Sequence, residues 1–149
     1  RGETFFSSNV TLVRALSVAL DILLKQGLSA WHQRIQRRAE FVRKLAPTFG
    51  LRLFPELASP SLSAFFTPGD SSLLRSQLES LHGITVMGGQ DQLKGKILRI
   101  GHMGYIPAEA HRRLFEALQA LLWSQTKGGG TPPENWSQVQ ALLEKESPD

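Results

Sequence analysis

Apolar side chains recur every three to four residues in the first third of the chain, which is the period of an amphipathic helix. The pattern predicts one helix over residues 9–26 and a second over residues 29–49, ended by Gly27 and Gly50. The inward positions of both helices are apolar: Val13, Leu16, Leu20, Leu23, Trp31, Ile35, Ala39 and Val42.

The period changes in the middle of the chain, where short apolar segments are bounded by glycine and proline. Such segments are typical of strands, and there are four: residues 51–54, 61–66, 84–87 and 96–100. A helix over residues 71–81 lies between the second and the third, and another helix begins at Pro107. Its inward stripe is Leu114, Ala117, Leu118, Leu121 and Leu122. This order predicts an α+β domain, a small and mainly antiparallel sheet covered by helices.

The composition limits the class of protein. The chain has 149 residues, 41% of them apolar, which allows one ordinary core with short appendages. It has no cysteine and four scattered histidines, so neither a disulfide framework nor a metal site is predicted. No apolar stretch reaches the roughly 20 residues of a membrane helix, and no targeting segment is visible. We therefore expect a soluble, cytoplasmic protein without membrane contact, and Arg1 indicates a cut N-terminus.

The net charge of +4 raises the question of nucleic acid, because lysine and arginine neutralise phosphates. The densest basic stretch lies on the second helix, opposite its apolar stripe: Arg34, Arg37, Arg38, Arg43 and Lys44. This spacing is typical of a solvated helix face, and no aromatic nucleic-acid motif accompanies it. We therefore expect no nucleic-acid partner, with a basic nucleic-acid adaptor as the alternative.

Arg99 stands out among the residues that could carry chemistry. Alternation along its strand places Ile97 and Arg99 on one face, and Leu98 on the other. The guanidinium is either a structural group with a buried stem or a bidentate ligand for an anion such as a carboxylate. His102 follows the strand and is either an acid or base or a structural hydrogen-bonding group, and we assign it no catalytic role.

The other histidines and the lysines give weaker signals. We expect surface positions for His32, His82 and His111, which have charged neighbours. No lysine stands in an apolar setting that would lower its pKa and make it a nucleophile, so no catalytic residue is predicted in the chain.

Residues 88–104 read GGQDQLKGKILRIGHMG. This string resembles the glycine-rich signature near the C-terminus of class V, pyridoxal-phosphate-dependent aminotransferases. The branch it is most similar to contains the alanine–glyoxylate and serine–glyoxylate aminotransferases and the cyanobacterial soluble hydrogenase 42 kDa subunit proteins. The likeness extends in order over residues 1–123, and residues 127–149 match nothing in that family.

The resemblance implies the C-terminal small domain of a fold type I pyridoxal-phosphate-dependent transferase, preceded by a long interdomain helix. It implies three parts: an interdomain segment and helix (1–27), the small domain (28–126), and a linker with a helical tail (127–149). The large domain of the same chain, which holds the Schiff-base lysine in that family, has no counterpart in this sequence. The chain alone is therefore expected to be inactive and to bind no pyridoxal phosphate.

The resemblance also assigns individual residues. Arg99 falls on the family's arginine for the substrate carboxylate. Ser7 falls on a threonine that reaches the cofactor phosphate of the partner subunit in a homodimer, and Thr4 lies in the same segment. Serine in place of threonine, with Ser8 where proline is usual, alters this turn.

The parent enzyme implied by the family exchanges an amino group between serine or alanine and a 2-oxo acid such as glyoxylate or pyruvate. Two further alternatives are a non-catalytic subunit or interaction module derived from this domain, and another class V enzyme such as a desulfurase or lyase.

Overall fold

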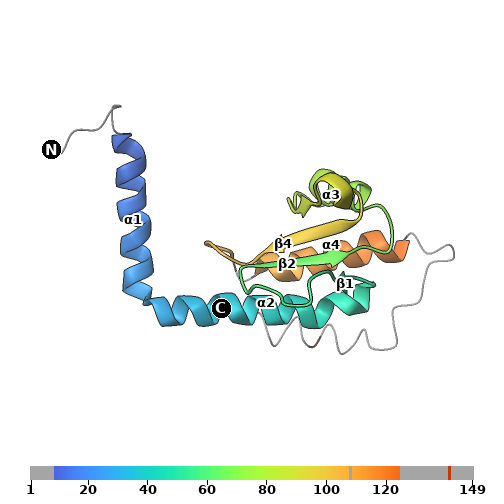
Figure 1. Ribbon diagram of the computed structural model, residues 1–149, viewed down its shortest axis with the longest axis horizontal. Coiled ribbons are helices and arrows are strands. Elements are labelled where there is room, and N and C mark those ends of the chain that lie inside the picture. The colour runs from blue at the N-terminus through green and yellow to red at the C-terminus, as the bar shows by residue number, and fades with distance from the viewer. Residues whose placement is uncertain (1–8, 108, 125–140, 142–149) are drawn as a thin grey trace. The chain divides into compact units, whose positions relative to one another are not determined.

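The computed structural model describes residues 9–107, 109–124 and 141 (Figure 1). The chain divides into two units, Arg1–Gln33 and Arg34–Asp149. Among the described residues, no helix is both long enough and apolar enough to cross a bilayer.

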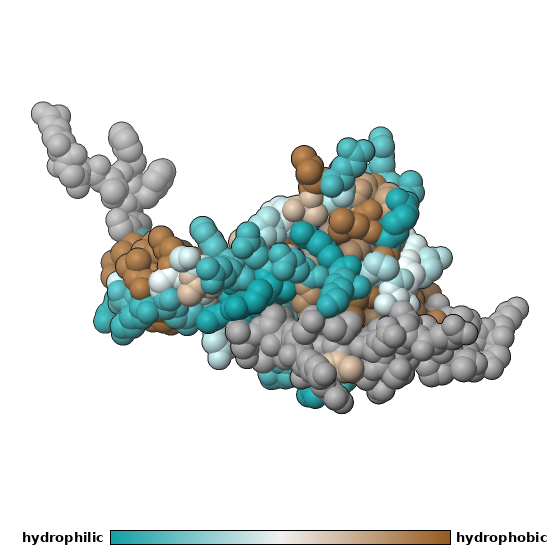
Figure 2. Space-filling view, turned by 90° about the horizontal axis from the view of Figure 1, so that it is seen from below, coloured by the Kyte–Doolittle hydropathy of each residue, from teal (hydrophilic) through white to brown (hydrophobic). Residues whose placement is uncertain are grey.

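The first unit contains helix α1, Val10–Gln26. Its N-terminus is capped by the Asn9 side chain, which accepts a hydrogen bond from the Leu12 amide at 3.0 Å. Gly27 ends the helix with a φ of 84° and donates its amide to the last carbonyls. None of the α1 side chains is buried, and Figure 2 shows apolar atoms gathered on this helix. The predicted helix over residues 9–26 is therefore confirmed, with its apolar stripe exposed.

Helix α2, Leu28–Leu45, continues into a 3₁₀ turn, Ala46–Phe49. Gly50 closes that turn in the left-handed conformation, with a φ of 70°, which a residue with a side chain rarely adopts. The predicted second helix is thus confirmed as one α-helix with a tighter last turn. Its buried side chains in the second unit include Ile35, Ala39 and Val42.

The second unit is built on a four-stranded sheet with the order β1-β2-β4-β3, in which every neighbouring pair is antiparallel. The strands are β1 (Arg52–Leu53), β2 (Leu62–Phe66), β3 (Met87–Gly88) and β4 (Ile97–Gly101). In the described part of this unit, two further helices follow, α3 (Ser71–His82) and α4 (Glu109–Ser124). The predicted α+β class with an antiparallel sheet is confirmed.

One face of the sheet carries the hydrophobic core. Phe65 of β2 stands opposite Leu98 of β4, and both are almost completely buried. They pack in one cluster with side chains from helices α2, α3 and α4, including Val42, Leu78 and Leu118. Each such side chain contributes about 1.5–3 kcal/mol on burial. Since the core lies on this face, the neighbouring side chains in each strand point to the opposite face.

The predicted strand over residues 84–87 is wrong in most of its length, since only Met87 and Gly88 pair with β4. The reason lies in the end of α3. Gly83 turns left-handed with a φ of 64°, and the Ile84 amide donates to the Leu78 carbonyl, so this segment still completes the helix. The tail helix expected around Trp136, Val139 and Leu143 lies outside the described residues.

Candidate functional site

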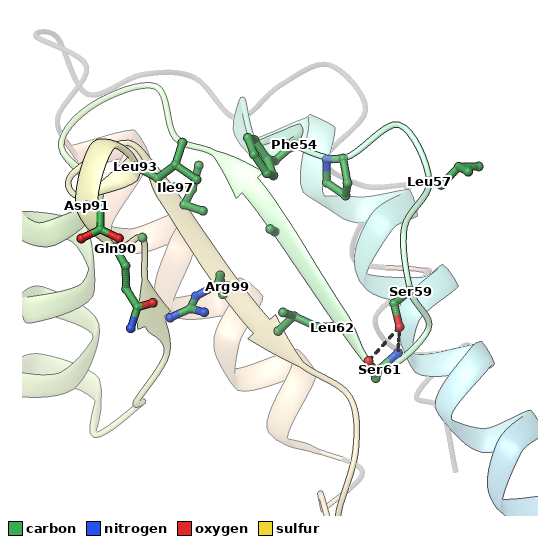
Figure 3. Close-up of a pocket in the computed structure, with 13 residues that line it drawn as sticks. Phe54, Leu57, Ser59, Ser61, Leu62, Gln90, Asp91, Leu93, Ile97 and Arg99 are labelled. Atoms are coloured by element: carbon green, nitrogen blue, oxygen red, sulfur yellow. Dashed lines mark hydrogen bonds between the residues drawn. The ribbon is translucent and has the colours of Figure 1, made fainter.

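A groove of about 560 Å³ lies against the sheet and is lined by side chains of its open face (Figure 3). Arg99 of β4 and Ala64 of β2 stand side by side at its floor, because the two residues are paired in the sheet register. The remaining lining is mixed apolar and polar: Phe54, Pro55, Leu57, Ser59, Ser61, Leu62, Gly89, Gln90, Asp91, Leu93 and Ile97. The groove can therefore receive a small molecule with both an apolar and a charged part.

Arg99 is held at the middle of the sheet, between Ala64 on β2 and Met87 on β3. Its Nε donates a hydrogen bond to the Gly88 carbonyl at 2.8 Å. Among the described residues, neither terminal guanidinium nitrogen has a hydrogen bond or an ion pair. The side chain is half-buried, and these two nitrogens are positively charged donors at the groove.

The segment Gly88 to Leu93 forms one wall of the groove. It begins in β3 and ends in a 3₁₀ turn, Asp91–Leu93, which opens with Asp91 at a φ of 48°. That φ is unusual for a residue with a side chain and marks a tightly constrained turn. In Figure 3 the side chains of Gln90 and Arg99 lie on the same side of β4.

The opposite wall, around Ser59 and Leu62, is fixed from below by helix α2. The Arg43 guanidinium donates to the carbonyls of Ser59 and Leu62, the second at 3.3 Å. Its Nε also donates to the Ser63 hydroxyl at 2.9 Å. These three hydrogen bonds join Arg43 to β2 and to the segment that precedes it. They hold this wall of the groove in place.

His102 lies at the end of β4, on the core side of the sheet, and does not line the groove. It is fully buried, and its Nε2 lies 2.9 Å from the Ser63 hydroxyl. Its Nδ1 is buried without a hydrogen-bond partner. An orphaned acceptor is easier to bury than an orphaned N–H, so the neutral tautomer with the proton on Nε2 is favoured. The structural interpretation of His102 is therefore the one the geometry supports.

His111 of α4 is also buried, so its predicted surface position is wrong. Its ring centroid lies 6.0 Å from that of His102 and 6.4 Å from that of Phe41. The pKa of both histidines is lowered from 6.5 to about 4. Burial is the largest cause, and charge repulsion adds to it, from His111, Arg43 and Arg38 on His102 and from Arg38 on His111. Both rings are therefore neutral at physiological pH.

The solvated basic face expected on α2 is wrong for Arg38, which is only 3% exposed. Its guanidinium donates to the carbonyl of Ile106 at 2.8 Å and to that of Gly104 at 3.2 Å. It also reaches the carbonyl of His102 at 3.4 Å. Arg38 therefore ties α2 to the loop that follows β4, and this part of the basic stretch serves the fold.

Comparison with known proteins decides the family. No model of a protein family matches the chain. It is 35% identical over 109 residues to the soluble hydrogenase 42 kDa subunit of Anabaena cylindrica, covering 71% of this chain and 28% of that protein. It is 33% identical over 104 residues to the pyridoxamine–pyruvate transaminase of Mesorhizobium japonicum, covering 66% of this chain and 26% of that protein.

Among solved structures, the fold is similar to the alanine–glyoxylate aminotransferase of Nostoc sp., with a TM-score of 0.75 and 30% identity. The match covers 80% of this chain and 33% of that one. The homologues of this chain are class V aminotransferases and the cyanobacterial soluble hydrogenase subunit. Its fold matches the C-terminal part of aminotransferase structures, and it spans about a third or less of the length of these relatives.

Class V aminotransferases imply pyridoxal phosphate, which needs a lysine in a desolvated pocket for its Schiff base. The lysines in the described part of the chain are Lys25, Lys44, Lys94 and Lys96, and all of them are exposed. None lines the groove. The described residues therefore do not by themselves supply the lysine for this cofactor, and the charged group that they place at the groove floor is the Arg99 guanidinium.

The two other residues assigned from the class V resemblance, Ser7 and Thr4, lie outside the described residues. The sequence singled out Arg99 as a candidate but did not identify the groups that surround it. Arg43 was hidden in a basic stretch, and its partners come from a segment some 20 residues away. Gly89 belongs to a glycine pair whose individual roles only the backbone geometry distinguishes.

Proposed function

We propose that the protein carrying this chain is a pyridoxal-phosphate-dependent aminotransferase, in which the chain supplies Arg99 to bind the substrate carboxylate. The observation that carries the proposal is the guanidinium itself. Its Nε is occupied by the Gly88 carbonyl, and its two terminal nitrogens face the groove without a partner among the described residues. A planar fork of this kind matches the two oxygens of a carboxylate.

The proposed substrates are alanine or serine as amino donor and glyoxylate or pyruvate as acceptor. The names of two relatives support small carboxylates, since one acts on pyruvate and the other on alanine and glyoxylate. Alanine and pyruvate differ only in the group at the reacting carbon, and both place a carboxylate next to it. A fixed carboxylate ligand therefore holds donor and acceptor in the same orientation.

The bound cofactor supplies the electron sink for the exchange of the amino group. In this proposal the rest of the protein, a large domain, holds the cofactor and its lysine. Residues 1–27 connect that domain to the small domain (28–126), and residues 127–149 form a linker and tail. Ser7, with Thr4 beside it, reaches the cofactor phosphate across a homodimer, and the protein is cytoplasmic.

The test is to express the complete protein that contains this chain and to measure its reaction. With pyridoxal phosphate, alanine and glyoxylate, we expect pyruvate and glycine as products, with serine as an alternative donor. Ethylamine, which is alanine without its carboxylate, should react far more slowly, and Arg99→Met should remove this difference. If the complete protein shows neither turnover nor the absorbance of a cofactor Schiff base, the non-catalytic subunit is the better description.

A further inference from the structure

The hydrogen bond between Arg99 and Gly88 restricts how the guanidinium can bind a carboxylate. An arginine can use either Nε with one terminal nitrogen or both terminal nitrogens to make two parallel bonds. Here Nε already donates to the Gly88 carbonyl at 2.8 Å. Only the two terminal nitrogens remain, so the carboxylate has to meet Arg99 end-on, along the axis of the side chain.

The Gly88 carbonyl, which sets the direction of the guanidinium, precedes a turn whose backbone conformation is sterically restricted. A Cβ atom on Gly89 would lie 2.1 Å from the Leu93 carbonyl oxygen and 2.5 Å from its carbon. It would also lie 2.9 Å from the side chain of Ile97. Because the first two contacts are with backbone, no side-chain rearrangement relieves them. Any residue other than glycine at position 89 must open the turn.

Gly88 differs from its neighbour in this respect. A Cβ atom on Gly88 would have no atom within 4 Å, and its φ is not in the left-handed region. Its contribution is a backbone carbonyl, which every residue has. The geometry therefore requires glycine at position 89 and allows other residues at position 88.

Further backbone bonds tie the turn to β4, the strand that carries Arg99. The Gly89 amide donates to the Ile97 carbonyl at 3.2 Å, and the Lys96 amide donates to the Leu93 carbonyl at 3.0 Å. Gly88 itself stands opposite Leu98 in the β3–β4 register. The hydrogen bonds between β3 and β4 therefore place both the Gly88 carbonyl and the Arg99 side chain. Opening the turn separates these two groups.

We propose that Gly89 is a positioning residue for Arg99: the turn that only glycine permits holds the Gly88 carbonyl against Nε, so that Arg99 presents both terminal nitrogens end-on to the groove. This deepens, and rests on, the proposed role of Arg99 as the carboxylate ligand. Gly89 touches no substrate and acts only through the direction of the guanidinium.

The positioning role is tested first on the full chain, without substrate. The Nε–H of Arg99 gives its own signal in a ¹⁵N-resolved NMR spectrum, assigned by its loss in Arg99→Lys. In the wild type and in the matched control Gly88→Ala, this proton should be protected from exchange with water. In Gly89→Ala it should exchange about tenfold faster or more, because its acceptor has moved. Amide signals of core residues such as Val42 and Leu118 report whether the domain remains folded.

A second variant covers the case in which Gly89→Ala does not fold. One glycine inserted between Gln90 and Asp91 lengthens the turn without any steric overlap, and surface turns tolerate such insertions. It should release the Arg99 Nε–H in the same way. An unchanged Nε–H exchange rate in the folded Gly89→Ala chain, or an equal loss of protection in Gly88→Ala, overturns the positioning role.

Kinetics of the complete protein separate this proposal from the one it rests on. Gly89→Ala should raise KM for alanine about tenfold or more while the reaction of ethylamine stays within about twofold. Gly69→Ala, at an exposed position that does not line the groove and has open space for a Cβ atom, should leave both unchanged. If Arg99→Lys has no effect on KM for alanine, the carboxylate role of Arg99 fails whatever the NMR result. If Arg99→Lys raises KM and Gly89→Ala does not, only the positioning role fails.

Discussion

Replacing His111 by phenylalanine should make the second unit less sensitive to acid. His111 and His102 are buried side by side, and the pKa of each is lowered to about 4. The folded chain therefore takes up these protons only near pH 4, whereas the unfolded chain takes them up near 6.5. More protons bound in the unfolded state mean that stability is complete above pH 6.5 and is lost as the pH falls toward 4.

The size of the effect follows from the same values. With a pKa of 6.5 unfolded and about 4 folded, one ring lowers the free energy of unfolding by about 2 kcal/mol between about pH 8 and pH 5. Phenylalanine fills a similar volume and keeps the edge contact with Phe41. The variant should therefore lose about 2 kcal/mol less than the wild type over that interval.

Urea unfolding at several pH values, followed by far-UV circular dichroism, measures this difference. His32→Gln is the matched control, since His32 is exposed on α2, and it should keep the wild-type pH dependence. Carboxylates that titrate below pH 5 act equally in all three proteins and cancel. Identical pH profiles for His111→Phe and the wild type would show that the buried pair is not what makes the fold acid-sensitive.

Three further outcomes are expected. Asp70→Ala removes the side-chain cap of α3, which accepts from the Ser72 amide at 2.8 Å, and should lower the free energy of unfolding by about 1 kcal/mol in urea titrations; an unchanged midpoint would refute the cap. The chain alone, incubated with pyridoxal phosphate and borohydride, should show no single specifically labelled lysine by mass spectrometry and no turnover. The exposed stripe of α1 should make the chain self-associate in analytical ultracentrifugation, and Leu16→Glu with Leu20→Glu should yield a monomer; a wild-type monomer at high concentration contradicts this.

The periodicity of apolar residues within each helix and strand was enough to predict most of the fold. The glycines that end α1, the 3₁₀ turn after α2 and α3 marked the boundaries. The periodicity failed where a contact joins distant segments. Arg38 was predicted as solvated, but its partners are carbonyls more than 60 residues later, which no helical wheel contains. His111 was misplaced for the same reason, since the ring that it stacks against belongs to the end of β4.

The candidate site shows the same limit. Alternation along β4 correctly predicted that Arg99 faces away from Leu98, and the register confirms it. The residue's neighbours on that face come from β2 and β3, whose order in the sheet the sequence did not fix. The hydrogen bond to Gly88, which directs the guanidinium, depends on that order and on the tight turn at Gly89.

The most direct test of the account is Arg99→Lys in the complete protein, measured by steady-state kinetics with alanine and by a thermal melt. Lysine keeps the charge but loses the planar pair of donors, so we predict a loss of about 2 to 4 kcal/mol in transition-state binding. This corresponds to a fall of about 30-fold to 900-fold in kcat/KM. The melting temperature should change by less than about 4 °C, because the terminal nitrogens make no hydrogen bond within the described residues. Arg52→Lys on the same face of the sheet should change neither quantity. A markedly lower melting temperature with kcat/KM within a few-fold of the wild type would contradict the account and make Arg99 a structural residue.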